Sequence, residues 1–264
     1  MLHYTKKFSC HQKEWLVLLH GLGGKSTLFY KQADYLSQHY NLLFIDLPGH
    51  GDSPGLDLKY YVPADVVPKI TELLEKLNIS RAHFLTFSLG TIIGNELMFR
   101  AKQYIHTMTL AGPVLKFNRW TSMLIESAWM LRHFAPYMLF YKTFAYLIMP
   151  KKSHAKSRFY FVQEAAKLGR KEFIKWTYLL KNAKKPYKQL QQSECNIPKL
   201  YLIGREDHLF LEEAKRAVEY NRYATLQIID DCGHVCVIEK SVESNEAIHQ
   251  FINSNKCYEK VSSP

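Results

Sequence analysis

The first part of the chain alternates short runs of apolar residues with amphipathic stretches. The runs have the length of buried strands, and the stretches between them have the spacing of helices. The apolar runs predict strands over 15–19, 42–45, 82–86 and 107–111. The stretches between them predict helices over 26–38, 71–77 and 89–100, the second of which is expected to begin some residues before 71. Strands separated by helices indicate βαβ crossovers, so we expect a mostly parallel sheet with helices on both faces.

The pattern changes after residue 113. No convincing strand follows for about 80 residues, and large apolar residues recur there at helical spacing: Trp120, Met123, Leu124, Trp129, Met130 and Leu131. Two more strands and a last helix are then predicted over 199–203, 226–229 and 239–252. We therefore expect an α/β core of residues 1–113 and 193–264, interrupted over 114–192 by a helical insertion that forms a cap, or lid.

The composition is that of an ordinary globular protein. The chain has 264 residues, of which 47% are hydrophobic and 22% charged, which suits one large domain or a core with a modest insertion. The apolar run over 15–19 is too short for a signal sequence or a membrane span, and no other stretch reaches about 18 uncharged apolar residues. The five cysteines are odd in number and scattered, which favours a reducing compartment. We expect a cytoplasmic protein.

The charge is strongly positive and is concentrated in the helical insertion. The formal net charge is +11, and residues 116–190 hold 16 Lys and Arg against 3 Asp and Glu, so this segment carries the whole excess. One interpretation is that the lysines only coat solvated helix faces. A single-sign face also creates a positive potential, which would suit an anionic membrane surface or an anionic substrate. No nucleic-acid-binding motif accompanies the charge, so we expect no nucleic acid partner.

The pentapeptide Thr86-Phe87-Ser88-Leu89-Gly90 carries the candidate nucleophile. It follows a predicted strand and opens a predicted helix, where a tight turn exposes a serine above the helix N-terminus. Gly90 lets the turn close without a side-chain clash. The usual pattern is G-x-S-x-G, and here Thr86 replaces the first glycine. Taken alone, the pentapeptide fits an N-cap serine equally well.

A glycine-rich loop supplies a candidate oxyanion hole. The loop over 20–24, with the sequence H-G-L-G-G, directly follows the first predicted strand. Such a loop can turn a backbone N–H toward the crevice, where it would act together with the N–H of Leu89. The alternative is a phosphate-binding turn, but the loop lacks G-x-G-x-x-G, and no glycine stands five residues before Gly24 to complete a P-loop. We expect no cofactor.

An acid and a base follow two later strands. Asp207 ends the G-R-E-D segment after the strand over 199–203, and His234 follows the strand over 226–229. Ligands of open parallel sheets bind beyond the carboxyl ends of the strands, so Ser88, Asp207 and His234 can converge there.

Two cysteines beside the candidate base suggest an alternative use of this loop. Cys232 and Cys236 flank His234. C-x-H-x-C is not a standard zinc spacing, so we expect no metal. Oxidation of a thiol beside the site is a milder alternative.

Five segments together resemble the α/β-hydrolase superfamily, in its capped, single-domain branch. They are H-G-L-G-G at 20–24, D-L-P-G-H-G-D-S at 46–53, S-x-G at 88–90, G-R-E-D at 204–207 and G-H at 233–234. The resemblance covers residues 14–253, and the order serine, aspartate, histidine along the chain is also that of the family. It implies an α/β fold with an eight-stranded, mostly parallel sheet and a helical cap. A serine at position 88 argues against the branches that use an aspartate nucleophile.

The resemblance also implies a mechanism. Ser88 attacks an acyl carbonyl, His234 accepts and returns the proton, and Asp207 orients the imidazole. The backbone N–H groups of Leu22 and Leu89 bind the oxyanion. Our first hypothesis is a serine hydrolase that cleaves a carboxylic ester or thioester of a hydrophobic acyl substrate through an acyl-enzyme. The alternatives are a lyase or C–C bond hydrolase on the same triad, or a ligand-sensing signalling protein with this fold.

Overall fold

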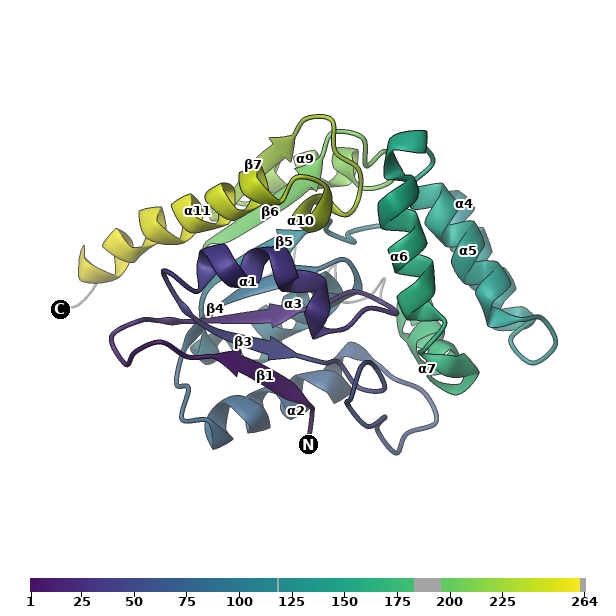
Figure 1. Cartoon of the computed structure of the whole chain (residues 1–264), viewed down its shortest axis with the longest axis horizontal. Helices are drawn as coiled ribbons and strands as arrows, with labels where there is room; N and C mark the ends of the chain where they lie inside the picture. The colour runs from purple at the N-terminus through teal and green to yellow at the C-terminus, as the bar shows by residue number, and fades with distance from the viewer. Residues whose placement is uncertain (118, 183–195, 262–264) are drawn as a thin grey trace.

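A seven-stranded sheet forms the centre of the molecule. The computed structural model describes residues 1–117, 119–182 and 196–261, with side chains described as far as residue 255. The strands lie in the order β1-β3-β2-β4-β5-β6-β7 (Figure 1), with β1 antiparallel to β3 and all other neighbours parallel. Their bounds are β1 Tyr4–Lys7, β2 Trp15–Leu19, β3 Asn41–Ile45, β4 Ala82–Phe87, β5 Ile105–Ala111, β6 Lys199–Gly204 and β7 Ala224–Ile229. β2 to β6 are buried along almost their whole length, as strands covered on both faces require.

The sheet differs from the prediction in two respects, its number of strands and its edge strand. The resemblance implied eight strands, whereas the described residues form seven. β1 was not predicted, because Thr5, Lys6 and Lys7 are exposed and give this segment no apolar run. It is the edge strand beside β3, and charged side chains on an edge discourage a further strand from pairing with it. The sheet therefore ends at β1 in the part of the chain that the structure describes.

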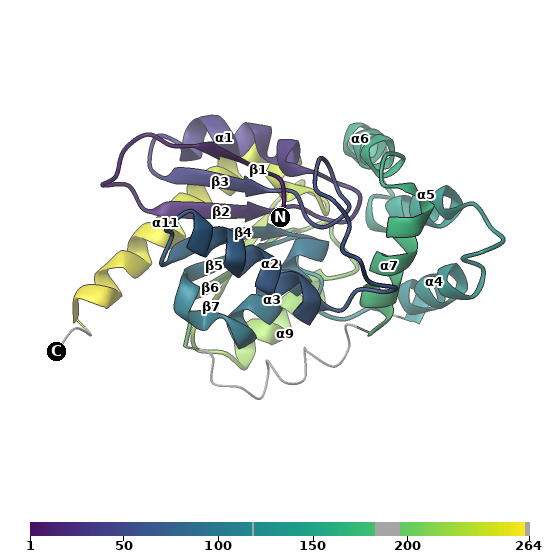
Figure 2. The same ribbon diagram turned by 90° about the horizontal axis from the view of Figure 1, so that it is seen from below.

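Helices cover both faces of the sheet. Figure 2 shows α1 and α11 on one face and α2, α3 and α9 on the other. Their bounds, with those of the shorter turns, are η1 Ser26–Phe29, α1 Tyr30–Leu36, α2 Pro63–Lys76, α3 Leu89–Arg100, η2 Lys102–Tyr104, α9 Leu211–Glu219, α10 Cys236–Glu239 and α11 Ser241–Val261. α3 is buried over most of its length because it packs against β4 and β5 of the sheet and against α2. The predicted class, α/β with a mostly parallel sheet, is confirmed.

Within the described residues, four helices between β5 and β6 form a layer beyond one end of the sheet (Figures 1 and 2). They are α4 Arg119–Met130, α5 Tyr137–Ile148, α6 Ala155–Ala165 and α7 Gly169–Asn182, with the turn η3 Lys152–His154 before α6. α4 contacts α5 and α7, and α5 contacts α6. The predicted end of the helical insertion at residue 192 lies outside the described residues. No helix of the described chain is long and apolar enough to cross a membrane.

Candidate active site

Ser88 stands in the tight turn between β4 and α3. Its backbone has φ 51° and ψ −118°, a conformation that residues other than glycine rarely adopt and that costs on the order of 1–3 kcal/mol. The Ser88 N–H donates to the carbonyl of Ala111 at 3.0 Å, and the N–H and hydroxyl of Thr91 donate to the Ser88 carbonyl at 2.8 and 2.6 Å. A Cβ at Gly90 would lie 2.6 Å from the carbonyl oxygen of Leu19. Glycine is therefore required two residues after the serine.

A glycine within α3 makes room for the threonine that departs from the usual turn pattern. Thr86 is fully buried, and its hydroxyl donates to the carbonyl of Thr109 at 3.1 Å. A Cβ at Gly94 would lie 3.0 Å from Cγ2 of Thr86. The turn stays tight because Gly94 has no side chain, and its absence leaves room for the side chain of Thr86.

The structure brings Ser88, His234 and Asp207 together at the carboxyl ends of β4, β7 and β6. Ser88 Oγ lies 2.9 Å from His234 Nε2, and His234 Nδ1 lies 2.7 Å from Asp207 Oδ2. Ser88 is 5% exposed and the other two are fully buried. The rings of Phe87 and Phe210 flank the imidazole, with centroids 5.5 and 5.6 Å from it. This arrangement lets a hydroxyl donate to an imidazole whose other nitrogen is held by a carboxylate.

The two loops that carry the acid and the base touch through their backbones. A Cβ at Gly204 would overlap the carbonyl oxygens of Cys232 and Gly233. The N–H of Glu206 donates to the carbonyl of Cys232 at 2.8 Å. Since β6 and β7 are neighbours in the sheet, this close approach fixes the distance between the acid and the base.

The two predicted oxyanion donors lie on segments that meet at the serine. A Cβ at Gly21 would lie 3.0 Å from Cβ of Ser88, so the glycine-rich loop rests against the turn. The amides of Leu22 and Leu89 make no hydrogen bond with any group in the described chain. Two unpaired amides beside a serine are able to bind an oxyanion.

Three side chains hold the glycine-rich loop in place. The hydroxyl of Tyr141 in α5 donates to the carbonyl of Leu22 at 2.6 Å, and the N–H of Gly23 donates to Nε2 of His50 at 3.0 Å. His20 Nε2 accepts an N–H from the loop after β3 at 2.9 Å. Burial lowers the pKa of His20 to about 4 and that of His50 well below its ordinary value. Both rings are therefore neutral at pH 7 and can accept an amide proton.

The loop after β3 is organised by one carboxylate. Asp46 accepts the N–H of Ser26 at 2.7 Å and that of Asp52 at 3.1 Å, and it lies 2.9 Å from Nδ1 of His3. Burial acts to raise the pKa of Asp46, but these hydrogen bonds outweigh it and hold the pKa below its ordinary value. His3, Asp46 and Asp52 form the only trio of clustered metal-ligand atoms within the described residues. Because both Asp46 oxygens already accept amide protons, we assign this trio a structural role.

The cysteines beside His234 are buried thiols. The Sγ of Cys232 faces the carbonyl of Gly233 at 3.6 Å, and that of Cys236 faces the carbonyl of Leu202 at 3.8 Å. Burial raises the pKa of Cys236 to about 12 and that of Cys232 well above its ordinary value. A buried, protonated thiol is inert, so neither a zinc site nor thiol oxidation is favoured here.

A cavity of about 300 Å³ opens beside the serine turn. Its lining includes Phe87, which precedes Ser88, Val235, which follows His234, and Leu22, a predicted oxyanion donor. Phe161 of α6 and Ile238 of α10 also line it. A smaller apolar cavity of about 40 Å³ also touches Leu22 and lies among α4, α5 and α7. Mostly apolar walls suit a hydrophobic group.

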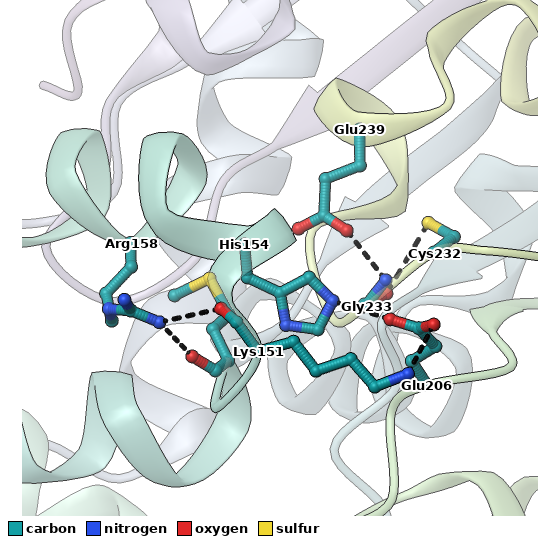
Figure 3. Close-up of polar contacts among 8 residues, drawn as sticks. Lys151, His154, Arg158, Glu206, Cys232, Gly233 and Glu239 are labelled. Atoms are coloured by element: carbon teal, nitrogen blue, oxygen red, sulfur yellow. Dashed lines mark hydrogen bonds and ion pairs between the residues drawn. The ribbon is translucent and has the colours of Figure 1, made fainter.

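The turn η3 and Lys151 just before it, which lead into α6, contact both the loop that carries the acid and the loop that carries the base (Figure 3). Lys151 Nζ lies 2.6 Å from Glu206 Oε1, and His154 Nε2 lies 2.9 Å from Glu206 Oε2. The Lys151 ammonium, which donates a hydrogen bond to Glu206, lowers the pKa of that carboxyl. A Cβ at Gly233 would lie 2.8 Å from His154 Nε2, and the Gly233 N–H donates to Glu239 Oε2 at 2.6 Å. Sequence reasoning missed this contact because Lys151 and His154 carry no motif.

The sequence profile of the alpha/beta hydrolase family matches residues 16–248. The match spans β2 to α11, and so includes Ser88, Asp207 and His234. The chain therefore belongs to the α/β-hydrolase family.

Curated relatives match part of the chain. The (E)-2-((N-methylformamido)methylene)succinate hydrolase of Acinetobacter baylyi is 30% identical over 114 residues, which are 43% of this chain and 42% of the relative. The pimeloyl-[acyl-carrier protein] methyl ester esterase of Aeromonas salmonicida is 31% identical over 93 residues, 35% of each protein. The chain thus spans about two fifths or less of the length of these relatives.

Solved structures match over nearly the whole chain. A hydrolase from Pseudomonas aeruginosa PA01 superposes with a TM-score of 0.83 at 20% identity, over 95% of this chain and 94% of that one. The enol-lactonase of Burkholderia xenovorans LB400 has a TM-score of 0.80 at 18% identity, over 96% of both chains. At these identities the superpositions show a shared fold.

Proposed function

We propose that the chain is a serine hydrolase that cleaves a carboxylic ester or thioester of a hydrophobic acyl group through an acyl-enzyme intermediate. One observation carries the proposal: Ser88 Oγ lies 2.9 Å from His234 Nε2, and His234 Nδ1 lies 2.7 Å from Asp207 Oδ2. The positive φ of Ser88 supports it, because strained backbone clusters at functional sites. The names of the two relatives, a hydrolase and a methyl ester esterase, support the same reaction class.

In the proposed reaction, Ser88 Oγ attacks the carbonyl carbon while His234 Nε2 accepts its proton. Asp207 holds the opposite N–H, which fixes the tautomer and stabilises the imidazolium. The charge that develops on the carbonyl oxygen is bound by the amides of Leu22 and Leu89. His234 then protonates the leaving alcohol or thiol, and a water activated by the same ring releases the acid.

The cavity beside Ser88 supports a hydrophobic acyl group of modest size. Its volume of about 300 Å³ is at the lower end of the range for ligand pockets. Lys25 and Glu164 are the charged side chains of its lining and are partly exposed. We place the polar part of the substrate beside them and the acyl chain against the apolar wall.

We propose that the helices of 114–192 act as a cap over the core. Phe161 of α6 lines the same cavity as Leu22 of the core, so a movement of α6 would open or close it. The contacts of Lys151 and His154 with Glu206 (Figure 3) anchor the start of α6 beside the site. The cap would thus keep bulk solvent away from the acyl chain, as closed sites do, and admit only the water that hydrolyses the acyl-enzyme.

We also propose the cytoplasm as the compartment. Cys10, Cys232 and Cys236 are free thiols, which is typical of a reducing environment. Fractionation of cells that express the tagged full chain tests this proposal.

Hydrolysis of a chain-length series of p-nitrophenyl esters tests the function. We expect turnover by the wild type, with a preference for the chain lengths that fill the cavity, and a covalent fluorophosphonate adduct on Ser88. Labelling of Ser88 without ester turnover would favour the lyase or C–C bond hydrolase alternative. Neither labelling nor turnover would favour a ligand-sensing protein.

A further inference from the structure

The helix α4 presents an apolar face to solvent. Its outer positions recur at helical spacing and continue into the connection to α5: Trp120, Met123, Met130, Leu131 and Phe134, hereafter the α4 stripe. Their exposed fractions run from 47% at Leu131 to 85% at Phe134. The residues of α4 that are buried lie on its other face: Thr121, Ile125 and Ala128. The stripe contributes little to the core, and apolar side chains gathered on a surface mark an interaction site.

The stripe ends at a projecting tip of the molecule. Figures 1 and 2 both show the connection between α4 and α5 extending away from the sheet beyond the other helices. Arg170 of α7 fixes this connection, because its guanidinium donates to the carbonyls of His133 at 3.0 Å and Ala135 at 2.7 Å. Phe134 stands between these two anchored residues. The tip is therefore held in one shape that exposes an aromatic ring.

Apart from Glu126, which is paired with Lys181, the charged groups beside the stripe are basic. Lys116 and Arg119 are exposed just before it, and Arg132 lies within the tip. The three acids of this helical segment are each paired with a lysine: Glu126 with Lys181, Glu164 with Lys167 and Glu172 with Lys175. Lys116 and Arg119 form no ion pair within the described part of the chain. The net field around the apolar stripe is consequently positive.

We propose that the α4 stripe docks the protein on an anionic lipid membrane. Phe134 and Met130 enter the headgroup region, and the neighbouring Lys and Arg side chains bind lipid phosphates. Exposed aromatic and aliphatic side chains flanked by basic residues are the combination that binds such an interface. A second copy of the chain is a poorer occupant, because both copies carry a net charge of +11 and repel each other. Docking goes beyond the hydrolysis proposed above and does not require Ser88.

Vesicle co-sedimentation tests the docking. Full-length protein is mixed with phosphatidylcholine vesicles, with and without phosphatidylglycerol, at low and high salt. We expect binding to the anionic vesicles only, and its loss as salt shortens the Debye length from about 10 Å at 0.1 M to about 3 Å at 1 M. Trp120 is 71% exposed, so its fluorescence should shift to the blue on binding.

Two double variants locate the surface. Lys116→Glu with Arg119→Glu should weaken vesicle binding by at least about tenfold, since each basic residue near an anionic surface contributes about fivefold. Met130→Ser with Phe134→Ser should also weaken it by at least about tenfold, because these apolar side chains no longer enter the headgroup region. The controls lie on the core: Tyr220→Ser, which alters a side chain that is 81% exposed, and Lys76→Glu with Lys102→Glu. We expect the controls to bind as the wild type does, and all these variants to hydrolyse a short soluble ester normally.

The results that would overturn docking are distinct from failure of the proposed reaction. Absence of low-salt binding to anionic vesicles by protein that still hydrolyses a soluble ester would overturn it, as would equal binding to neutral vesicles. An equal loss of binding in the core controls would exclude the α4 stripe as the membrane-binding surface. If the protein did not bind vesicles but formed a dimer that the Met130 and Phe134 substitutions dissociate, the stripe would be a dimer interface instead. Ser88→Ala should bind vesicles as the wild type does.

Discussion

At the scale of single residues, Ser88 Oγ and His234 Nε2 lie 2.9 Å apart, and the proposed reaction makes them one functional unit. Ser88→Ala should lower kcat/KM for a p-nitrophenyl ester by at least about 10³-fold, because nucleophile and base act together. The measurement is ester kinetics with fluorophosphonate labelling, and thermal unfolding serves as the folding control. Equal labelling of the variant and the wild type would exclude Ser88 as the nucleophile.

Two adjacent carboxylates have separate partners. Asp207 lies against His234, whereas Glu206 lies against Lys151 and His154. Asp207→Asn should reduce kcat by roughly 10²–10⁴-fold through loss of the correct imidazole tautomer. Glu206→Gln is the matched control and should leave kcat within a few fold. If the two variants behaved the other way round, the assignment of the acid would shift by one residue.

Under the proposed reaction, Tyr141 is a positioning residue for the loop that carries Leu22, one of the two proposed oxyanion donors. Its hydroxyl donates to the carbonyl of Leu22 at 2.6 Å, and such a bond contributes about 0.5–1.5 kcal/mol. Tyr141→Phe should therefore lower kcat about two- to tenfold with little change in KM. Tyr146→Phe, at an exposed position of the same helix, is the control. A change in KM alone would point to a role in binding the substrate instead.

The three candidate site residues were predictable because each follows a predicted strand, and parallel strands bring their carboxyl ends to one edge. The supporting residues were not. Tyr141 and His50 act through contacts with a loop far away in the sequence, and no local pattern marks them. Gly94 is likewise explained only by the side chain of Thr86 across from it.

At the scale of elements, the strands with apolar runs were predictable, whereas β1 and α9, which have one buried residue or none, were not. β4 and α3 coincide closely with the predicted segments, because buried apolar runs leave little ambiguity. α2 begins at Pro63 and contains Pro68, so its first turns give a weaker helical signal than the predicted part from 71 onward. α9 was missed because only Ala214 of its nine residues is buried.

The turn before α6 is one of the elements that tie the proposed cap to the core. His154 is 2% exposed and contacts Glu206, beside the acid of the site. His154→Ala should speed amide hydrogen exchange in η3 and α6 and raise KM severalfold, with a smaller effect on kcat, because the anchor rather than the chemistry is removed. Lys152→Ala, at the exposed neighbouring position, is the control. A fall in kcat without faster exchange would contradict an anchoring role.

At the scale of the whole molecule, buried histidines couple folding to pH. Burial lowers the pKa of His20 to about 4 and that of His50 well below its ordinary value, whereas both titrate near about 6.5 when unfolded. Between these values the unfolded chain binds protons that the folded chain does not. The free energy of unfolding should therefore fall as pH is lowered from about 6.5 toward 4. For His20 the shift corresponds to about 3 kcal/mol, and this contribution is lost by pH 4.

Urea unfolding at several pH values measures this dependence. His20→Gln keeps an acceptor in the buried position and should flatten the dependence between about pH 6.5 and 4. His133→Gln, at an exposed position of the cap, should leave it unchanged. An unaltered pH dependence in His20→Gln would mean that other groups control the acid sensitivity.

The strained backbone of Ser88 also has an evolutionary consequence. With φ 51° and ψ −118°, this position disfavours almost every side chain, so under the proposed function it is selection for the reaction that keeps a serine there. A lineage that no longer needed hydrolysis would gain stability from a glycine at this position, since glycine adopts such angles without strain. Descendants that keep the fold but carry glycine in place of Ser88 would thus be recognisable as proteins that have turned to another use.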